Sequence, residues 1–224
     1  MFFVKENRPY LIGPITKTKP AKGIITFIIG LAAGFALNSI CVMVARANGN
    51  ITITHASNVN IGLFIFAAVA VFIQATTEEL QSRGMAFEMM SEVAPTWLSA
   101  VLSGIFFACL HLVNNGITVV SFLSITAVGI CYSIIYYFTG SIWLPAGMHM
   151  AWNFTQDFIY GLPDSGNPSG MSIMNSTAVS GGWAYSTDFG VEGGYMAIIV
   201  HVALALIVLA VGILLKKRKS AASL

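Results

Sequence analysis

Residues 61–83 read IGLFIFAAVAVFIQATTEELQSR, an apolar run that ends in two adjacent carboxylates and an arginine. An ionisable side chain at the centre of a bilayer costs roughly 2.5–3.5 kcal/mol or more, so such residues usually face a protein interior or a water-filled cavity. Glu78, Glu79 and Arg83 therefore predict a polar site held inside a membrane protein.

The helix that begins with this run is expected to continue past the carboxylates. No proline occurs between Glu78 and Val93, and most residues there are good helix formers. Pro95 disfavours helix in the residue before it. We therefore expect one long helix from about Ile61 to Glu92, with the carboxylates near its middle.

The composition of the whole chain supports a membrane protein. Of its 224 residues 56% are hydrophobic and 9% are charged, whereas a soluble domain carries about 25% charged residues. We predict an all-α, polytopic transmembrane helix bundle. Its expected spans are Gly23–Val44, Ile61–Thr76, Thr96–Val113, Ile117–Phe138, Ser141–Tyr160 and Tyr195–Leu215.

The distribution of positive charge predicts the orientation of the bundle. Five of the 11 Lys and Arg residues precede the first span and four form the tail 216–219, while residues 161–194 contain none. The positive-inside rule then places both termini in the cytoplasm. A basic run directly after an apolar span is ordinarily a membrane anchor, so no nucleic-acid partner is expected.

The domain organisation follows from these spans. Residues 161–194 are rich in Gly, Ser, Asn and Pro, and we expect either a lid over the bundle or, in better agreement with that composition, a solvated and partly mobile loop. The predicted units are a basic cytoplasmic segment (1–22), a single transmembrane bundle (23–215) with a core (61–160) and an outer loop (161–194), and a basic cytoplasmic tail (216–224).

Helix lengths predict that three polar groups reach the same depth. Glu78 lies about 15 residues before the turn expected near residue 94, and His111 about 17 after it, so at ~1.5 Å per residue both lie roughly 22–26 Å from that turn. His149 lies about nine residues beyond a second turn, at Thr139-Gly140, or ~14 Å along its helix. If the first turn projects further into the cytoplasm than the second, the three side chains are expected to meet in one central layer.

Residues four apart on a helix share a face, and this spacing recurs in each polar cluster. Arg83 can pair with Glu79, which leaves Glu78, about 100° away, free to face a cavity. A buried pair that only fixes helix register remains an alternative, as does a packing role for either histidine alone. His201 is expected to be structural. The pairs at this spacing are Glu79 with Arg83, Phe107 with His111, and His149 with Asn153.

Taken in order, these motifs resemble the CPBP family (CAAX protease and bacteriocin-processing enzymes, also called Abi), which includes the type II CAAX prenyl endopeptidases. The pattern is EExxxR, FxxxH and HxxxN/D, and the resemblance covers about residues 61–160. It implies an intramembrane endopeptidase, a hydrolase whose partners are a peptide or membrane-anchored protein substrate and the lipid bilayer. A prokaryotic plasma membrane is the expected location.

The resemblance also implies a role for each candidate residue. Glu78 would activate the attacking water and His111 would help to bind it. His149 and Asn153 would stabilise the oxyanion of the tetrahedral intermediate. Glu79 and Arg83 would organise the site. Many members carry an aromatic residue where this chain has Ser82, which suggests a more polar cavity wall and leaves the substrate class open.

The sequence is compatible with a zinc-dependent mechanism and with a metal-free one. Glu78, His111 and His149 match a catalytic zinc ligand set with an open position. However, the chain has no HExxH, and Asn153 beside the second histidine suits oxyanion binding better than ligation. We favour a mechanism that requires no cofactor, with Zn²⁺ as the alternative.

Two other classes of function are compatible with a buried polar cluster. A non-catalytic membrane immunity protein could sequester a peptide in the same cavity, and it would tolerate Glu78→Gln. A transporter could relay protons through the carboxylates and histidines, but it would call for inverted repeats or broken helices in matching halves. The sequence shows no such repeats.

Overall fold

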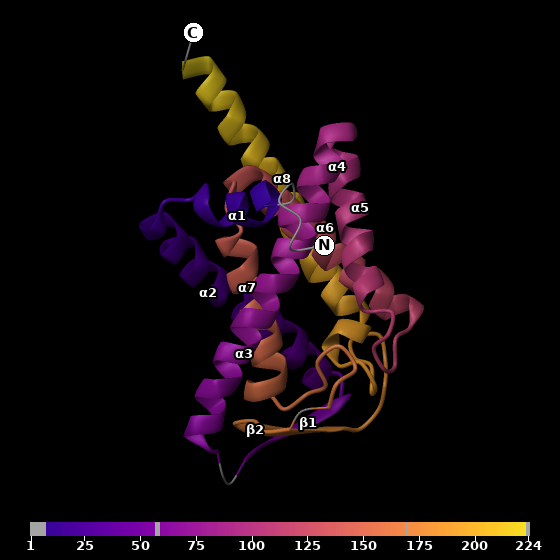
Figure 1. The fold of residues 1–224 in the computed structure, drawn as a ribbon. Coiled ribbons are helices and arrows are strands. Elements are labelled where there is room, and N and C mark those ends of the chain that lie inside the picture. The colour runs from indigo at the N-terminus through magenta and orange to yellow at the C-terminus, as the bar shows by residue number, and fades with distance from the viewer. Residues whose placement is uncertain (1–7, 57–58, 169, 223–224) are drawn as a thin grey trace.

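A computed structural model, which describes residues 8–56, 59–168 and 170–222, shows a helical bundle with a small two-stranded sheet at one end (Figure 1). The predicted all-α class is confirmed. The α-helices are α1 (Arg8–Thr16), α2 (Pro20–Ala47), α3 (Ile61–Glu79), α4 (Glu88–Val93), α5 (Thr96–Leu110), α6 (Val119–Thr139), α7 (Trp143–Phe154) and α8 (Tyr195–Ala222). The other elements are the π-helices η2 (Leu80–Phe87) and η3 (Thr155–Ile159), the 3₁₀-helix η4 (Val191–Gly193), and the strands β1 (Ile51–His55) and β2 (Met174–Ala178).

Each of the six apolar stretches forms a helix, and the chain is a multi-pass membrane protein. In the described part of the chain four helices are long and apolar enough to cross a membrane: Pro20–Ala47, Ile61–Val93, Val119–Thr139 and Tyr195–Arg218. The other two, α5 and α7, are shorter. The count of six spans and the cytoplasmic position of both termini remain predictions.

The long helix from Ile61 is present and ends at Val93, one residue beyond the expected end. Ala94 is extended and Pro95 caps α5, as the proline predicts. The middle of this helix differs from the expectation, because residues 80–87 form the π-helix η2. Such wider turns are often found at functional sites, and this one carries Arg83 directly after the two carboxylates.

Helix α5 ends at Leu110, three residues before the expected end of that span, and this places His111 at its C-cap. Gly116 has a φ of +70° and lies in the turn that follows. Thr118 and Ser121 then form a capping box that starts α6. Because the helix stops at Leu110, the His111 side chain projects from a helix end.

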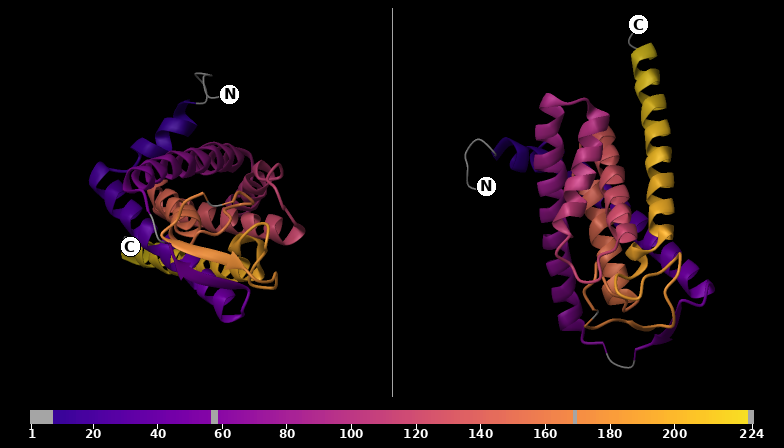
Figure 2. Two further views of the ribbon diagram at one scale, coloured as in Figure 1. Left: turned by 90° about the horizontal axis from the view of Figure 1, so that it is seen from below. Right: turned by 90° about the vertical axis from the view of Figure 1, so that its right-hand side faces the viewer.

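The described residues of the segment 161–194 are hydrogen-bonded to the bundle and partly packed against it, which corrects the expectation of a fully solvated loop. Strand β2 pairs antiparallel with β1, from Ile51 opposite Ala178 to His55 opposite Met174. Elsewhere in the segment, Leu162, Tyr185, Phe189 and Val191 are buried. Figures 1 and 2 show the sheet and this loop covering one end of the bundle, away from the C-terminal end of α8. Apolar side chains spaced through a Gly-rich sequence account for this packing.

Basic side chains lie at the end of the bundle opposite this loop. Lys17 pairs with Glu88 at 3.2 Å, and Lys216 donates a hydrogen bond to the Tyr137 hydroxyl at 2.7 Å. Helix α1, which was not predicted, packs against η2 at this end. The separation of charge along the bundle therefore agrees with the pattern on which the predicted orientation rests.

Close packing of α2 against α7 fixes the position of the helix that carries His149. Gly30 and Gly34 of α2 face Gly147 and Met148 of α7 so closely that an added Cβ would collide with the partner backbone. Small residues four apart allow this approach in membrane helices.

We predict that Gly34→Ala destabilises the protein by about 1–3 kcal/mol, the usual cost of overpacking, because the new methyl group would meet the Met148 carbonyl. The measurement is thermal unfolding in detergent. Gly62→Ala is the matched control, since a Cβ there meets only Asn60 Oδ1 at 3.4 Å. Equal melting temperatures for the two variants would contradict the packing described.

Candidate active site

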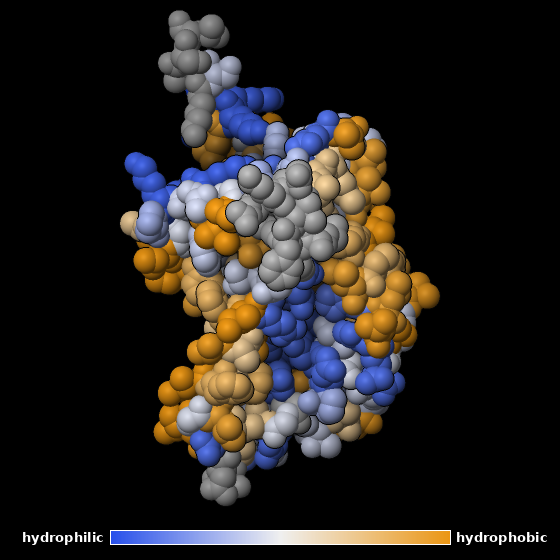
Figure 3. Space-filling view, viewed as in Figure 1, coloured by the Kyte–Doolittle hydropathy of each residue, from blue (hydrophilic) through white to orange (hydrophobic). Residues whose placement is uncertain are grey.

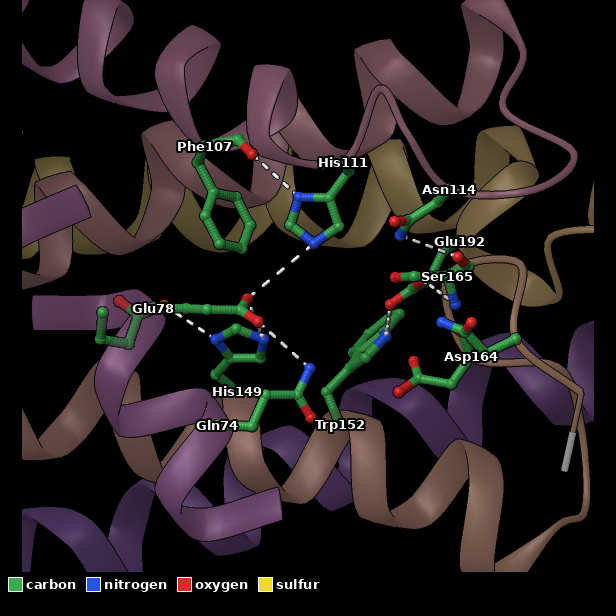
Figure 4. A network of polar contacts seen from close by, with 12 residues as sticks. Gln74, Glu78, Phe107, His111, Asn114, His149, Trp152, Asp164, Ser165 and Glu192 are labelled. Carbon is green, nitrogen blue, oxygen red and sulfur yellow. Dashed lines mark hydrogen bonds and ion pairs between the residues drawn. The ribbon is translucent and has the colours of Figure 1, made fainter. Parts of the chain in front are cut away.

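The Glu78 carboxylate lies between two imidazole rings (Figure 4). Its Oε2 atom is 3.9 Å from His111 Nε2 and 3.7 Å from His149 Nε2. Its Oε1 atom accepts a hydrogen bond of 3.1 Å from Gln74 Nε2, one turn earlier on α3. Three segments thus bring their polar groups to one point, as the helix lengths predicted.

A second, fully buried layer supports this contact. Arg83 Nη1 donates to Glu79 Oε1 at 3.0 Å, and the Nδ1 atom of His149 lies 2.9 Å from the same oxygen. Arg83 Nη2 donates to the carbonyl of Gly129 on α6 at 2.8 Å. The side chains of Glu79 and Arg83 have no exposed surface. Arg83 therefore ties the long helix to α6, while Glu79 orients the His149 ring.

Aromatic rings enclose the guanidinium of Arg83. Its Cζ atom lies 4.8 Å from the centroid of the Phe107 ring and 5.5 Å from that of Tyr132. Phe107 also packs edge-on against the rings of His111 and His149, at centroid distances of 4.8 and 5.6 Å. These contacts give Phe107 of the FxxxH motif a direct structural role, because it separates the arginine from the histidine of its own helix.

The partners of the histidines determine which ring nitrogen faces Glu78. His111 Nδ1 lies 2.9 Å from the Phe107 carbonyl, which can only accept, so Nδ1 carries a proton and donates. His149 Nδ1 donates in the same way to the Glu79 carboxylate. Both rings therefore present Nε2 to Glu78 and to the space beside it.

Asn153 lies one turn beyond His149 on α7 and is buried. It lines the same polar cleft as Glu78 and His111, and Figure 3 shows this cleft as a hydrophilic hollow between hydrophobic surfaces. The cleft gives water a route to a carboxylate in an otherwise apolar bundle. It is lined by Gln74, Thr77, Glu78, Gln81, Leu110, His111, Asn114, Asn153, Asp164, Ser165 and Asn167.

Ser82 does not line this cleft, which corrects the expectation of a more polar wall there. The residue is fully buried, and its carbonyl oxygen accepts a hydrogen bond of 2.8 Å from the Ser103 hydroxyl on α5. The π-helix, which begins at Leu80, changes the direction of the residues that follow Glu79. Ser82 therefore packs at the contact between helices.

The outer loop supplies site residues that the sequence did not indicate. Glu192 accepts hydrogen bonds from Trp152 Nε1 at 2.7 Å, from the Ser165 amide at 3.0 Å and from the Ser165 hydroxyl at 2.6 Å. Asn114 Nδ2 donates to the Ser165 carbonyl at 2.9 Å. Glu192 thus fastens the loop to the residue directly before Asn153. Only the tertiary fold reveals this, because no spacing relates these residues in the chain.

Asp164 of the same loop borders the cleft in an acidic environment. Burial raises the pKa of its carboxyl well above the usual value, and the negative charges of Glu192, Asp157 and Glu78 add to this effect. Asp157 does not itself line the cleft. His201 is structural as expected: its Nδ1 donates to the Ala197 carbonyl, and its ring lies against Trp152.

Glu78, His111 and His149 have suitable chemistry for zinc. Glu78 Oε2 lies 3.9 Å from His111 Nε2 and 3.7 Å from His149 Nε2. Within the described residues no group of three or more His, Cys, Asp or Glu side chains is arranged to hold a metal ion.

Comparison with known proteins agrees with the motifs. Residues 60–155 match the family model Rce1-like, described as type II CAAX prenyl endopeptidase Rce1-like. This part of the chain is similar to that family. The predicted resemblance is confirmed, and the match includes all six candidate residues. No curated protein and no solved structure matches the chain. The match supports intramembrane endopeptidase activity on a peptide or protein substrate.

We predict that Arg83→Met strongly destabilises the helix bundle, by about 3–5 kcal/mol, because it leaves the buried Glu79 carboxylate without its cation. Adding Glu79→Gln to Arg83→Met should recover part of this loss. Lys17→Met, which breaks an ion pair in which the lysine is 57% exposed, is the control and should have a much smaller effect. Thermal unfolding in detergent measures all three. Equal destabilisation by Arg83→Met and Lys17→Met would contradict the role assigned to the buried pair.

Proposed function

We propose that this protein is an intramembrane endopeptidase in which Glu78 activates the hydrolytic water without a metal ion. The observation that carries the proposal is the convergence of Glu78 Oε2, a buried oxygen without a hydrogen-bond partner in the described residues, with the Nε2 atoms of His111 and His149, beside a polar cleft that Glu78 lines. A general base must lie within hydrogen-bond reach of the water that it deprotonates. The cleft gives Glu78 access to such a water.

The charges of the buried groups support different protonation states, and therefore different roles, for the two histidines. Arg83 balances Glu79. Unpaired charge is costly in a low-dielectric interior, so Glu78 needs a second cation. His149 protonated on both nitrogens supplies it, and the four charges then sum to zero. In that form Nδ1–H donates to Glu79, and Nε2–H is available as a donor at the cleft.

His111 has the complementary role in this proposal. Since its Nδ1–H donates to the Phe107 carbonyl, the neutral ring offers an Nε2 lone pair beside Glu78. A water that contacts both Glu78 Oε2 and His111 Nε2 donates one hydrogen to each. The two groups thus hold the water with its oxygen lone pairs directed away from them, toward a bound substrate.

The reaction then follows as acid–base catalysis. Glu78 takes a proton as the water oxygen forms a bond to the scissile carbonyl carbon, and the carbonyl π electrons move to oxygen. His149 Nε2–H and Asn153 Nδ2–H donate to that oxyanion. When the intermediate collapses, the C–N bond breaks and the departing amine receives the proton from Glu78. The products are a carboxylic acid and an amine, which ionise to a carboxylate and an ammonium group.

We predict that Glu78→Gln lowers cleavage by about 100- to 10,000-fold, the usual contribution of a general base, while the protein stays folded. The assay uses purified protein in lipid vesicles with a library of membrane-embedded peptides, and mass spectrometry identifies the products. Glu92→Gln, at the far end of the same long helix, is the matched control and should cleave like wild type. Equal cleavage by Glu78→Gln and wild type would contradict the mechanism. Peptide binding by both without cleavage would favour the sequestering immunity function.

A separate prediction concerns the metal. Cleavage should survive exhaustive chelation, because the proposed base and oxyanion donors are all side chains of this protein. Metal content is measured in the same sample before and after treatment. Loss of activity that Zn²⁺ alone restores would overturn this part of the proposal and identify Glu78, His111 and His149 as ligands.

A further inference from the structure

A small second cavity lies beside the cleft. His111, Asn153 and Ser165 line both spaces, so the cavity is next to the candidate catalytic groups. Its volume is about 20 Å³. One water molecule needs roughly 10–15 Å³ on the same measure, so the cavity has room for one water or one methyl-sized group.

One face of α6 forms the far wall of this cavity. Ser124, Ile125, Val128 and Tyr132 lie on that wall, and Trp152 with Glu192 closes another side. Ile125 is 4% exposed and Tyr132 is 1% exposed. Trp152 is held by its hydrogen bond to Glu192. Because the walls are packed against other elements, the cavity is a preformed space of fixed size.

Ser124 provides an independent indication that the cavity receives a ligand. The residue is 1% exposed, and its Oγ atom has no hydrogen-bond partner within the part of the chain that the structure describes. A buried hydroxyl without a partner costs roughly 1–3 kcal/mol. A group that enters the cavity and hydrogen-bonds to this hydroxyl would remove that cost.

We propose that this cavity is the subsite for a side chain next to the scissile bond, and that it restricts this side chain to Gly, Ala or Ser. The inference rests on the proposed endopeptidase function and adds a substrate class to it. A methyl group fills the available space, and a serine hydroxyl can in addition bond to Ser124 Oγ. Valine and larger side chains would collide with the wall of α6.

Val128 is the residue that sets the size limit. It is half-buried on α6, and it packs with Ile125 on one side and with Tyr132 on the other. Truncation to alanine removes two methyl groups from the cavity wall. One methylene in an apolar pocket changes discrimination by about 10- to 200-fold. Val128→Ala should therefore admit a larger substrate side chain.

The experiment compares wild type, Val128→Ala and Val119→Ala on peptides that vary at each residue flanking the cleavage site. Val119 is on the same helix but is 76% exposed and does not line the cavity, so it is the matched control. Wild type and Val119→Ala should prefer Gly, Ala or Ser at one position. Val128→Ala should shift the kcat/KM ratio of Val to Ala there by at least about tenfold toward Val.

Ser124→Val tests the same cavity by making it smaller and less polar. It replaces the hydroxyl with a methyl group and adds a second methyl group, so cleavage of Ser peptides should fall relative to Gly peptides. A wild-type enzyme that cleaves Leu or Phe peptides as well as Ala peptides at both flanking positions would overturn the proposal. Unchanged preference in Val128→Ala and Ser124→Val would overturn it too, and would leave the cavity with a water only. These outcomes are distinct from failure of the proposed function, which shows as full cleavage by Glu78→Gln.

Discussion

The buried contact between Arg83 and Glu79 is the interaction on which the rest of the site depends. It places a guanidinium and a carboxylate where neither is solvated, so each needs the other and further polar partners. Those partners are the Gly129 carbonyl on α6 and the His149 ring on α7. One ion pair therefore fixes three helices relative to one another. It also leaves Glu78, the adjacent residue, to face the cleft.

Hydrolysis within an apolar bundle requires a supply of water and a barrier to uncontrolled solvation. The cleft provides the supply of water, since polar side chains line it from the outer loop to Glu78. The outer loop provides the barrier to uncontrolled solvation. Glu192 connects the loop to α7 through its hydrogen bonds with Ser165 and Trp152, and the same residue lines the small cavity beside His149. The outer loop thus borders both the cleft that admits water and the cavity that is proposed to select the substrate side chain.

Much of the helical architecture could be predicted, because burial and helix propensity act locally along a membrane chain. Apolar runs identified each long helix, and Pro95 identified the break after Val93. The π-helix at Leu80–Phe87 could not be predicted, since local propensity does not distinguish it from α-helix. The β1–β2 pairing also escaped prediction, because its two strands are over 100 residues apart and short. The Ser82 error followed directly from the unpredicted π-helix.

The sequence by itself determined which carboxylates, histidines and amide are candidates for the site, and in what order they occur. Spacing of four residues was sufficient to pair Glu79 with Arg83, because a helix brings those positions together wherever it occurs. Only the tertiary structure decided that His149 shares Glu79 with Arg83 and that Glu192 closes the site. Those contacts join segments with no common periodicity. Their formation depends on how whole helices and the outer loop pack, which no local pattern encodes.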